Sequence, residues 1–196
     1  MLLSEPRATV YFPAVPLTDV TIRYLELVSR SAFRARRSDR AGVVFAQVLQ
    51  PMPELSRFFY GAIGGEWFWL ERRPWTLERW NEYLASQNIE TWVLSVDGIP
   101  AGYCEMQKYR TGDVELMYFG LLRAFIGHGL GAHLLTEAVE RAWARGAERV
   151  ILDTCNLDHP MALANYLARG FREYRVDVHR KEVPATPPGP WEGALA

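Results

Sequence analysis

One stretch of this sequence restricts its fold more than any other: GLLRAFIGHGLGAHLL, residues 120–135. Gly127, Gly129 and Gly131 alternate with other residues, and a helical apolar pattern begins directly after them. Glycines between a strand and a helix let the backbone approach a bound group, while the first-turn N–H groups and the helix dipole attract negative charge. The stretch therefore predicts a phosphate-binding turn, and the alternative is a turn kept for close packing.

The segments around the glycines predict the order of the fold. Asp97 and Gly98 supply the positive-φ residues of a tight β-hairpin. The helix after the glycines has an apolar stripe and ends at Gly146. That stripe consists of Leu130, Leu134, Leu135, Ala138, Val139, Ala142 and Trp143. Strands are expected at 91–96, 101–109, 113–122, 149–155 and 171–183, with a second helix at 160–169. These elements predict an α/β fold with a mixed sheet flanked by helices.

The first ninety residues and the C-terminal end are less regular. Expected strands are TVYFPAV (9–15) and GVVFAQVLQ (42–50), and expected helices are 53–63 and 76–87, the latter capped by Thr76. Residues 184–196 are too rich in proline and glycine to pack regularly, so they are expected to form a floppy or partner-draped tail. The length of 196 residues suits one domain, which we place at 1–183.

Charge and cysteine content exclude several classes of protein. A net charge of −1 and a pI near 6.4 give no footprint for nucleic acid or an anionic membrane, and the basic run FRARRSDR (33–40) is expected to be a solvated loop. No apolar run is long enough to span a bilayer and no signal peptide starts the sequence, which predicts a cytoplasmic protein. Cys104 and Cys155 are expected to be buried free thiols, with neither a disulfide nor a metal site.

Two readings of the glycines compete. Gly127, Gly129 and Ala132 satisfy the G-x-G-x-x-A fingerprint of dinucleotide binding, with Asp153 placed to contact a ribose, which would make the chain an NAD(P)-dependent oxidoreductase. Against this, LLRAFI separates the strand from the first glycine, and too few residues follow Val150 for a six-stranded doubly wound sheet.

The second reading rests on two blocks, the glycine stretch and HPMALANYLARGF (159–171). At this spacing they resemble the GNAT superfamily of N-acetyltransferases, over a recognisable core at 91–174. The resemblance implies acetyl-CoA as cosubstrate and direct transfer of its acetyl group, in a ternary complex, to a primary amine of a small molecule or peptide. A non-catalytic acyl-CoA-binding module and a covalent acetyl-cysteine route remain as alternatives.

The resemblance also implies which residues bind the cosubstrate. Backbone groups near Phe119 to Leu121 would meet the thioester carbonyl and the pantetheine arm, and His159 would cap a helix or contact CoA. The family usually carries Gln or Arg where this sequence has Ile126, so the diphosphate would rest on backbone amides, helped by Arg123 or His128. The expected cofactor-binding set is Phe119, Leu121, Gly127, His128, Gly129, Leu130, Gly131, Ala132 and His159.

Acetyl transfer to an amine also needs a base and an acid. The resemblance assigns Glu115 as base and Tyr166 as acid, and Glu105 on the neighbouring strand is a rival base, as is a water relay. A solvent-facing Glu115 and a purely structural Tyr166 are the alternatives.

The acceptor is expected against the aromatic and charged stretch EWFWLERRPW (66–75), because aromatic faces and carboxylates suit a cationic amine. At least one of its rings, among Trp67, Phe68, Trp69 and Trp75, is expected to line the acceptor pocket. A homodimer is compatible with the sequence, which leaves the oligomeric state and the acceptor open.

Overall fold

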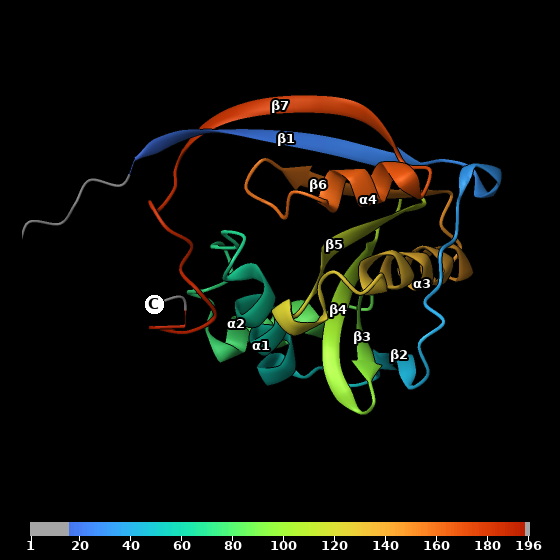
Figure 1. Cartoon of the computed structure of the whole chain (residues 1–196), viewed down its shortest axis with the longest axis horizontal. Helices are drawn as coiled ribbons and strands as arrows, with labels where there is room; N and C mark the ends of the chain where they lie inside the picture. Colours follow the sequence, from blue (N-terminus) through green and yellow to red (C-terminus); the bar gives the residue numbers. More distant parts are fainter. Residues whose placement is uncertain (1–15, 195–196) are drawn as a thin grey trace, which may run out of the picture.

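The protein, as a computed structural model, is described over residues 16–194. Seven strands form one mixed sheet in the order β2-β3-β4-β5-β6-β1-β7 (Figure 1). The strands are β1 (Leu17–Leu27), β2 (Val43–Val48), β3 (Ile89–Val96), β4 (Ile99–Lys108), β5 (Asp113–Leu121), β6 (Arg149–Cys155) and β7 (Arg172–Glu182). The helices are α1 (Pro53–Gly64), α2 (Leu77–Leu84), α3 (Leu130–Ala144) and α4 (Ala162–Ala168), with short 3-10 turns η1 (Arg30–Ala32) and η2 (Arg123–Phe125).

The hairpin, the helix cap and the apolar helix stripe that the sequence predicts are all present. Asp97 and Gly98, with φ of 53° and 81°, join β3 to β4, and the Thr76 side chain accepts the Arg79 N–H at the start of α2. Gly146 takes a φ of 79° just after α3, and the apolar stripe of that helix is buried. The mixed α/β class is therefore confirmed. The expected strand at 9–15 lies outside the described residues.

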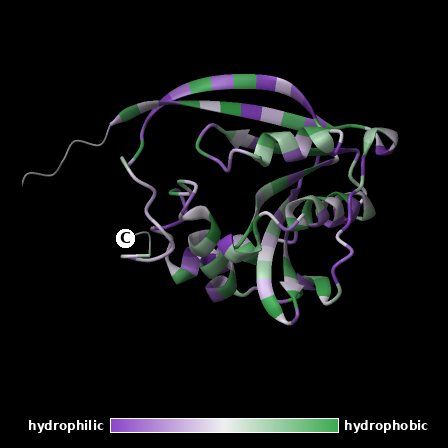
Figure 2. Ribbon diagram, viewed as in Figure 1, coloured by the Kyte–Doolittle hydropathy of each residue, from purple (hydrophilic) through white to green (hydrophobic). Residues whose placement is uncertain are grey.

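β1 is the element that the sequence pattern did not predict. It lies between β6 and β7 and is antiparallel to both, with Ile22 opposite Cys155 and Asp177. β1 and β7 form a long curved ribbon (Figure 1), along which hydrophilic and hydrophobic residues alternate (Figure 2). The register shifts between Tyr24 and Leu25. The extra residue is Tyr174 of β7, and β1 itself is continuous; its partners lie more than a hundred residues away, so local sequence does not show them.

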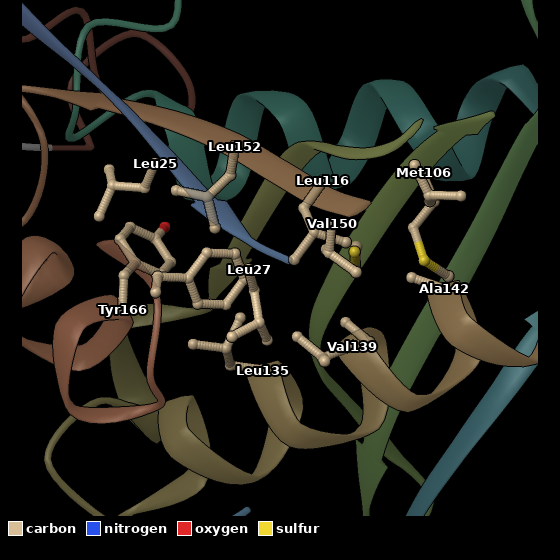
Figure 3. Packing of buried hydrophobic residues seen from close by; sticks show 14 of the residues in the cluster. Leu25, Leu27, Met106, Leu116, Leu135, Val139, Ala142, Val150, Leu152 and Tyr166 are labelled. Atoms are coloured by element: carbon tan, nitrogen blue, oxygen red, sulfur yellow. The ribbon is translucent and has the colours of Figure 1, made fainter. Parts of the chain in front are cut away.

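The helices cover both faces of the sheet. Tyr103 on β4 packs with Phe59 and Ile63 of α1, whereas its neighbour Cys104 belongs to the core built with α3 and α4. Successive residues of a strand point to opposite faces, so α1 lies on one side and the other two helices on the other. Figure 3 shows this second core, where Leu135 of α3 faces the β-strands.

The directions in which neighbouring strands pair test whether the glycine turn belongs to a dinucleotide-binding domain. β5 and β6 are parallel and α3 connects them, while the other neighbouring strands that the structure describes are antiparallel. This differs from the parallel, doubly wound sheet that a dinucleotide-binding domain requires. Across residues 16–194, none of the helices has the length and apolarity that crossing a bilayer requires.

The C-terminal tail packs against the domain, contrary to the expectation of a floppy or partner-draped end. Gly189 donates its N–H to the carbonyl of Gly65, and Arg73 Nη1 donates to the Gly189 carbonyl, both at 2.9 Å. A Cβ on Gly65 would lie 2.4 Å from the Gly189 backbone. Two glycines are therefore needed for this close approach, and their small size is what lets a Pro-rich segment dock at the end of α1.

A buried ion pair connects the segment before α2 to the sheet. Arg72 Nη1 lies 2.6 Å from Glu105 Oε2, and the two side chains are 4% and 0% exposed. Tyr83 donates a hydrogen bond to the same carboxylate oxygen, and the guanidinium lies over the rings of Tyr83 and Tyr118 at 4.0 and 4.1 Å. Aromatic faces and the carboxylate together compensate the buried cation.

Removing one partner of this pair leaves an uncompensated buried charge. We expect Arg72→Met to lower the free energy of unfolding by about 3–5 kcal/mol. Replacing both charges, Arg72→Met with Glu105→Leu, should recover much of that loss, because no buried charge then remains. Urea unfolding measures both values. Arg79→Met is the control, since Arg79 is exposed and lies over Trp75 at 4.6 Å, and its cost should stay below about 1 kcal/mol. An equal loss of unfolding free energy in Arg72→Met and Arg79→Met would contradict the role of the buried pair.

Candidate active site

The site begins where β5 and β6 part. These parallel strands pair at Asp113 with Arg149, Val114 with Val150 and Glu115 with Ile151, and both strands continue beyond that point. On the other side of β5, the register with β4 shifts so that Met117 is passed over. The gap leads into a cavity of about 1490 Å³. Typical ligand pockets measure about 300–1,000 Å³, so this one has room for a long cosubstrate together with an acceptor.

The glycine turn forms one wall of this cavity. Gly127 and Gly129 have φ of 86° and 76°, in the left-handed region, and nothing lies within 4 Å of a Cβ built on either. Gly129 is the N-cap of α3, and Gly131 is already helical. The first N–H groups of a helix have no partner within it, and the helix dipole makes this end positive. The open backbone therefore fits a diphosphate.

Most of the expected cofactor-binding residues line the cavity: Phe119, Leu121, Gly127, Gly129, Gly131, Ala132 and His159. The two others do not. Leu130 is fully buried in the core, so only its backbone amide is available, and His128 is exposed on the turn. His159 accepts the N–H of Met161 through Nδ1 at 3.1 Å; Met161 itself is the N-cap residue of α4.

Tyr166 reaches the cavity from α4. Its side chain packs in the core beside Leu25 of β1 and Leu135 of α3 (Figure 3) and is 7% exposed. The ring lies 6.1 Å from that of Phe119 on β5. Burial, followed by the charge of Asp158, raises the pKa of the Tyr166 hydroxyl well above its usual range. The hydroxyl therefore keeps its proton at neutral pH and is available as a donor.

The two carboxylates considered as bases lie outside the cavity lining. Glu115 accepts a hydrogen bond from the Tyr109 hydroxyl, beside the gap between β5 and β6. Glu105 is fully buried in its ion pair with Arg72. Neither side chain is among those that border the cavity.

Asp153 is the carboxylate that the search for a base missed. It lies on β6, two residues beyond the last pair with β5, and lines the cavity. Its side chain keeps contact with solvent, yet the cavity walls partly bury it, and this burial, together with the charges of Glu115 and Asp158, raises its pKa to about 6. In the sequence, Asp153 stands at the end of a predicted buried strand, but there it was considered as a contact to a ribose and not as a base.

Asp158 and Cys155 shape the turn between β6 and α4. Asp158 accepts hydrogen bonds from the Thr154 hydroxyl at 2.6 Å and the Cys155 N–H at 2.9 Å. Burial and the charge of Asp158 raise the pKa of the Cys155 thiol to about 11, so the thiol stays protonated at neutral pH. Cys155 is half-buried rather than buried, and Cys104 is fully buried; both are free. A protonated thiol is a weak nucleophile, which disfavours an acetyl-cysteine route.

Aromatic residues from the stretch 66–75 form the opposite wall. Trp67, Phe68 and Trp69 line the cavity with Glu71, while Trp75 packs away from it, 4.9 Å from the ring of Trp80. Phe68 has a φ of 58°, which is uncommon for a residue other than glycine. The segment thus presents ring faces and a carboxylate to the cavity, with the Trp67 ring 5.0 Å from that of His159.

The family follows from comparison with known proteins. Residues 50–171 match the model of the acetyltransferase (GNAT) family. The chain therefore belongs to the GNAT family of acetyltransferases. No curated protein matches the sequence closely enough to add a named relative.

Solved structures share the fold. The GCN5-related N-acetyltransferase from Sphaerobacter thermophilus is 20% identical with a TM-score of 0.65, covering 87% of this chain and 54% of that chain. The GCN5-related N-acetyltransferase from Kribbella flavida is 20% identical with a TM-score of 0.61, covering 85% and 60%. The ribosomal-protein-S18-alanine N-acetyltransferase from Escherichia coli is 16% identical with a TM-score of 0.54, covering 68% and 79%. The chain thus spans little more than half the length of the first two.

The raised pKa of Asp153 makes a prediction about stability. The unfolded carboxyl has a pKa of about 3.9, so the folded protein binds this proton more tightly, and stability is lost as the pH rises from about 4 to about 6. Asp153→Asn removes that loss. The difference between the thermal midpoint of this variant and that of the wild type should therefore increase from about pH 4 to about pH 6. It should level off above about pH 7.

Thermal unfolding followed between about pH 4 and pH 8 checks this. Asp177→Asn is the control: the hydrogen bond from Arg175 lowers the pKa of Asp177, so its effect on stability falls below about pH 4 and its relative midpoint should not rise over this interval. A relative midpoint of Asp153→Asn that falls with rising pH would contradict a raised pKa.

Proposed function

We propose that the protein is an N-acetyltransferase that moves the acetyl group of acetyl-CoA directly to a primary amine of a small molecule or peptide, within a ternary complex. The observation that carries this is one continuous cavity, bordered by the glycine turn, by Tyr166 and by Asp153. Membership of the GNAT family supports acyl transfer. The cysteine thiols are protonated at neutral pH, which favours direct transfer over a covalent enzyme intermediate.

The open backbone of the glycine turn and the parted edge of β5 would hold the cosubstrate. Amides from Gly127 to Ala132 suit the diphosphate, and backbone groups of Phe119 to Leu121 suit the pantetheine arm and the thioester carbonyl. Arg123 lies near this turn but pairs with Glu66 at 3.7 Å. When bound, acetyl-CoA supplies an acetyl thioester, whose acetyl group passes to the amine nitrogen while the sulfur leaves as the thiol.

Two protons move during this reaction. Asp153, or Glu115 through a water molecule, takes the proton that the amine nitrogen releases as it forms the amide. A pKa of about 6 leaves Asp153 ionised at neutral pH and still basic enough to accept a proton. The Tyr166 hydroxyl gives a proton to the departing sulfur and regains one from solvent afterwards. Acid and base therefore border the same cavity from α4 and β6.

The acceptor end of the cavity suits a cation. Glu71 and Asp153 line it with the rings of Trp67 and Trp69. A protonated amine is attracted by carboxylates and by aromatic faces, and Asp153 can then remove a proton from it. This supports an amine acceptor without naming the molecule.

An acceptor panel with detection of free thiol tests the proposal. Tyr166→Phe should reduce kcat by about 10²–10⁴ on any accepted amine, because the sulfur then leaves without its proton donor. Affinity for acetyl-CoA should change little. Tyr174→Phe, on the exposed face of β7, should retain full activity. Losses under about threefold in Tyr166→Phe would remove it from the chemistry.

The base is tested by the pH dependence of kcat/KM. If Asp153 accepts the proton, kcat/KM of the wild type should rise as the pH increases through about 6. Asp153→Asn should lose this rising limb of the pH profile together with most activity. Glu115→Gln should keep a limb shifted to lower pH, since one negative charge beside Asp153 is removed. Loss of the limb in Glu115→Gln with its retention in Asp153→Asn would assign the base to Glu115 instead.

A further inference from the structure

The basic run at 33–40, called the connector below, is a loop with mostly exposed side chains, as expected, but its backbone is anchored to α3 and α4. Arg34 donates its N–H to the carbonyl of Arg169 at the end of α4, at 3.0 Å. Arg36 exchanges two backbone hydrogen bonds with the Thr136 hydroxyl on α3, at 2.9 and 3.1 Å. A Cβ on Gly170 would lie 2.0 Å from the carbonyl oxygen of Ala32, so the connector packs tightly against the end of α4.

Arg34, Arg36 and Arg169 lie together without a counter-charge among the described residues, and the last two reach the cavity. Arg36 and Arg169 both line the cavity, and within residues 16–194 neither has a carboxylate oxygen within 4.0 Å. Arg169 is 9% exposed, and its Nε is buried without a hydrogen-bond partner. Burial, followed by the charges of Arg36 and Arg34, lowers the pKa of Arg169. A buried cation beside other cations is costly unless an anion compensates it.

The neighbouring arginines of the connector are different. Arg37 pairs with Glu140 at 2.5 Å and with Glu137 at 3.5 Å on α3, and Arg40 pairs with Asp97 at 3.1 Å. Of the four arginines in the run, Arg37 and Arg40 are thus paired, while Arg34 and Arg36 have no carboxylate partner among the described residues, and only Arg36 lines the cavity. This contrast points to a ligand rather than to general solubility.

The position along α3 identifies the anion. The Oγ1 of Thr136, which holds Arg36, lies 2.8 Å from the Ala132 carbonyl oxygen, one helical turn from the glycine amides. An anion bound by Arg36 would therefore lie about one helical turn along α3 from the amides that suit the diphosphate. Coenzyme A carries a third phosphate on its ribose, close to the diphosphate. We infer that Arg36 and Arg169 form a site for the ribose 3′-phosphate of coenzyme A.

This inference rests on the proposed function, and it deepens it. Guanidinium groups bind phosphate through paired N–H donors. The site would distinguish coenzyme A from dephospho-coenzyme A and from acyl groups carried on phosphopantetheine alone. It would also give the family's cosubstrate a contact from the segment before β2, outside residues 50–171.

Calorimetric titration with coenzyme A and with dephospho-coenzyme A, which differ only in this phosphate, tests the site. The wild type should bind coenzyme A about tenfold to a hundredfold more tightly, as expected for charge-assisted hydrogen bonds. The preference should decrease as salt is added. Arg36→Gln and Arg169→Gln should each reduce the preference to a few fold by weakening coenzyme A alone. Unchanged affinity for dephospho-coenzyme A shows that each variant is folded.

Arg37→Gln is the matched control, since it removes the same charge from the adjacent, paired residue and should keep the full preference. Adenosine 3′,5′-bisphosphate should compete better than ADP in the wild type and equally in Arg36→Gln. Equal wild-type affinity for the two coenzymes would overturn the site but leave acetyl transfer intact. Binding of neither coenzyme would instead overturn the proposed function. A rise in acceptor KM in Arg36→Gln, with coenzyme affinity unchanged, would assign the arginines to the acceptor and also overturn the site.

Discussion

Parallel pairing between β5 and β6 ends after Glu115 and Ile151, and the rest of the site depends on that early end. Past this point, the facing backbone groups of both strands have no partner in each other, so a ligand can use them. The α3 helix connects the same two strands, and its N-terminus therefore lies at the mouth of the gap. One interruption of the sheet thus supplies both a free strand edge and a positive helix end. The helices α1, α3 and α4 pack on the rest of the sheet, and this packing holds β5 and β6 apart at the gap.

The walls of the gap are held by interactions of a different kind. Arg72 and Glu105 join the aromatic segment to β4 with almost no exposure, and the stacked rings of Tyr83 and Tyr118 surround the guanidinium. On the other side, residues of β1 line the cavity while Leu25 and Leu27 pack in the core. Aromatic and aliphatic packing therefore fixes this part of the cavity wall. The glycine turn and the connector over α3 contribute backbone amides and arginines to the same cavity.

Sequence patterns predicted the parts that local chemistry determines. The hairpin at Asp97-Gly98, the buried stripe of α3 and the glycine turn each depend on residues within about one element of each other, so propensity and periodicity suffice. The place of β1, the raised pKa of Asp153 and the packing of Arg36 depend on partners more than a hundred residues away or on neighbouring strands. The side chains of FRARRSDR are mostly exposed, as expected of a charge run, but the hydrogen bonds that anchor its backbone to Thr136 and Arg169 leave no signal in the sequence. The assigned roles of Tyr166 and Glu115 remain predictions.

The central place of β1 affects how the chain can assemble. Leu17–Leu27 leaves the ribosome before any other strand described here, yet both of its neighbours, β6 and β7, are made last. Until those residues emerge, β1 exposes two unpaired edges and the apolar side chains of Leu25 and Leu27. Contacts of such long sequence separation slow folding, and the core that Tyr166 of α4 shares with Leu25 is complete only once β1 has paired. A nascent chain arrested before residue 172 would therefore keep one edge of β1 unpaired.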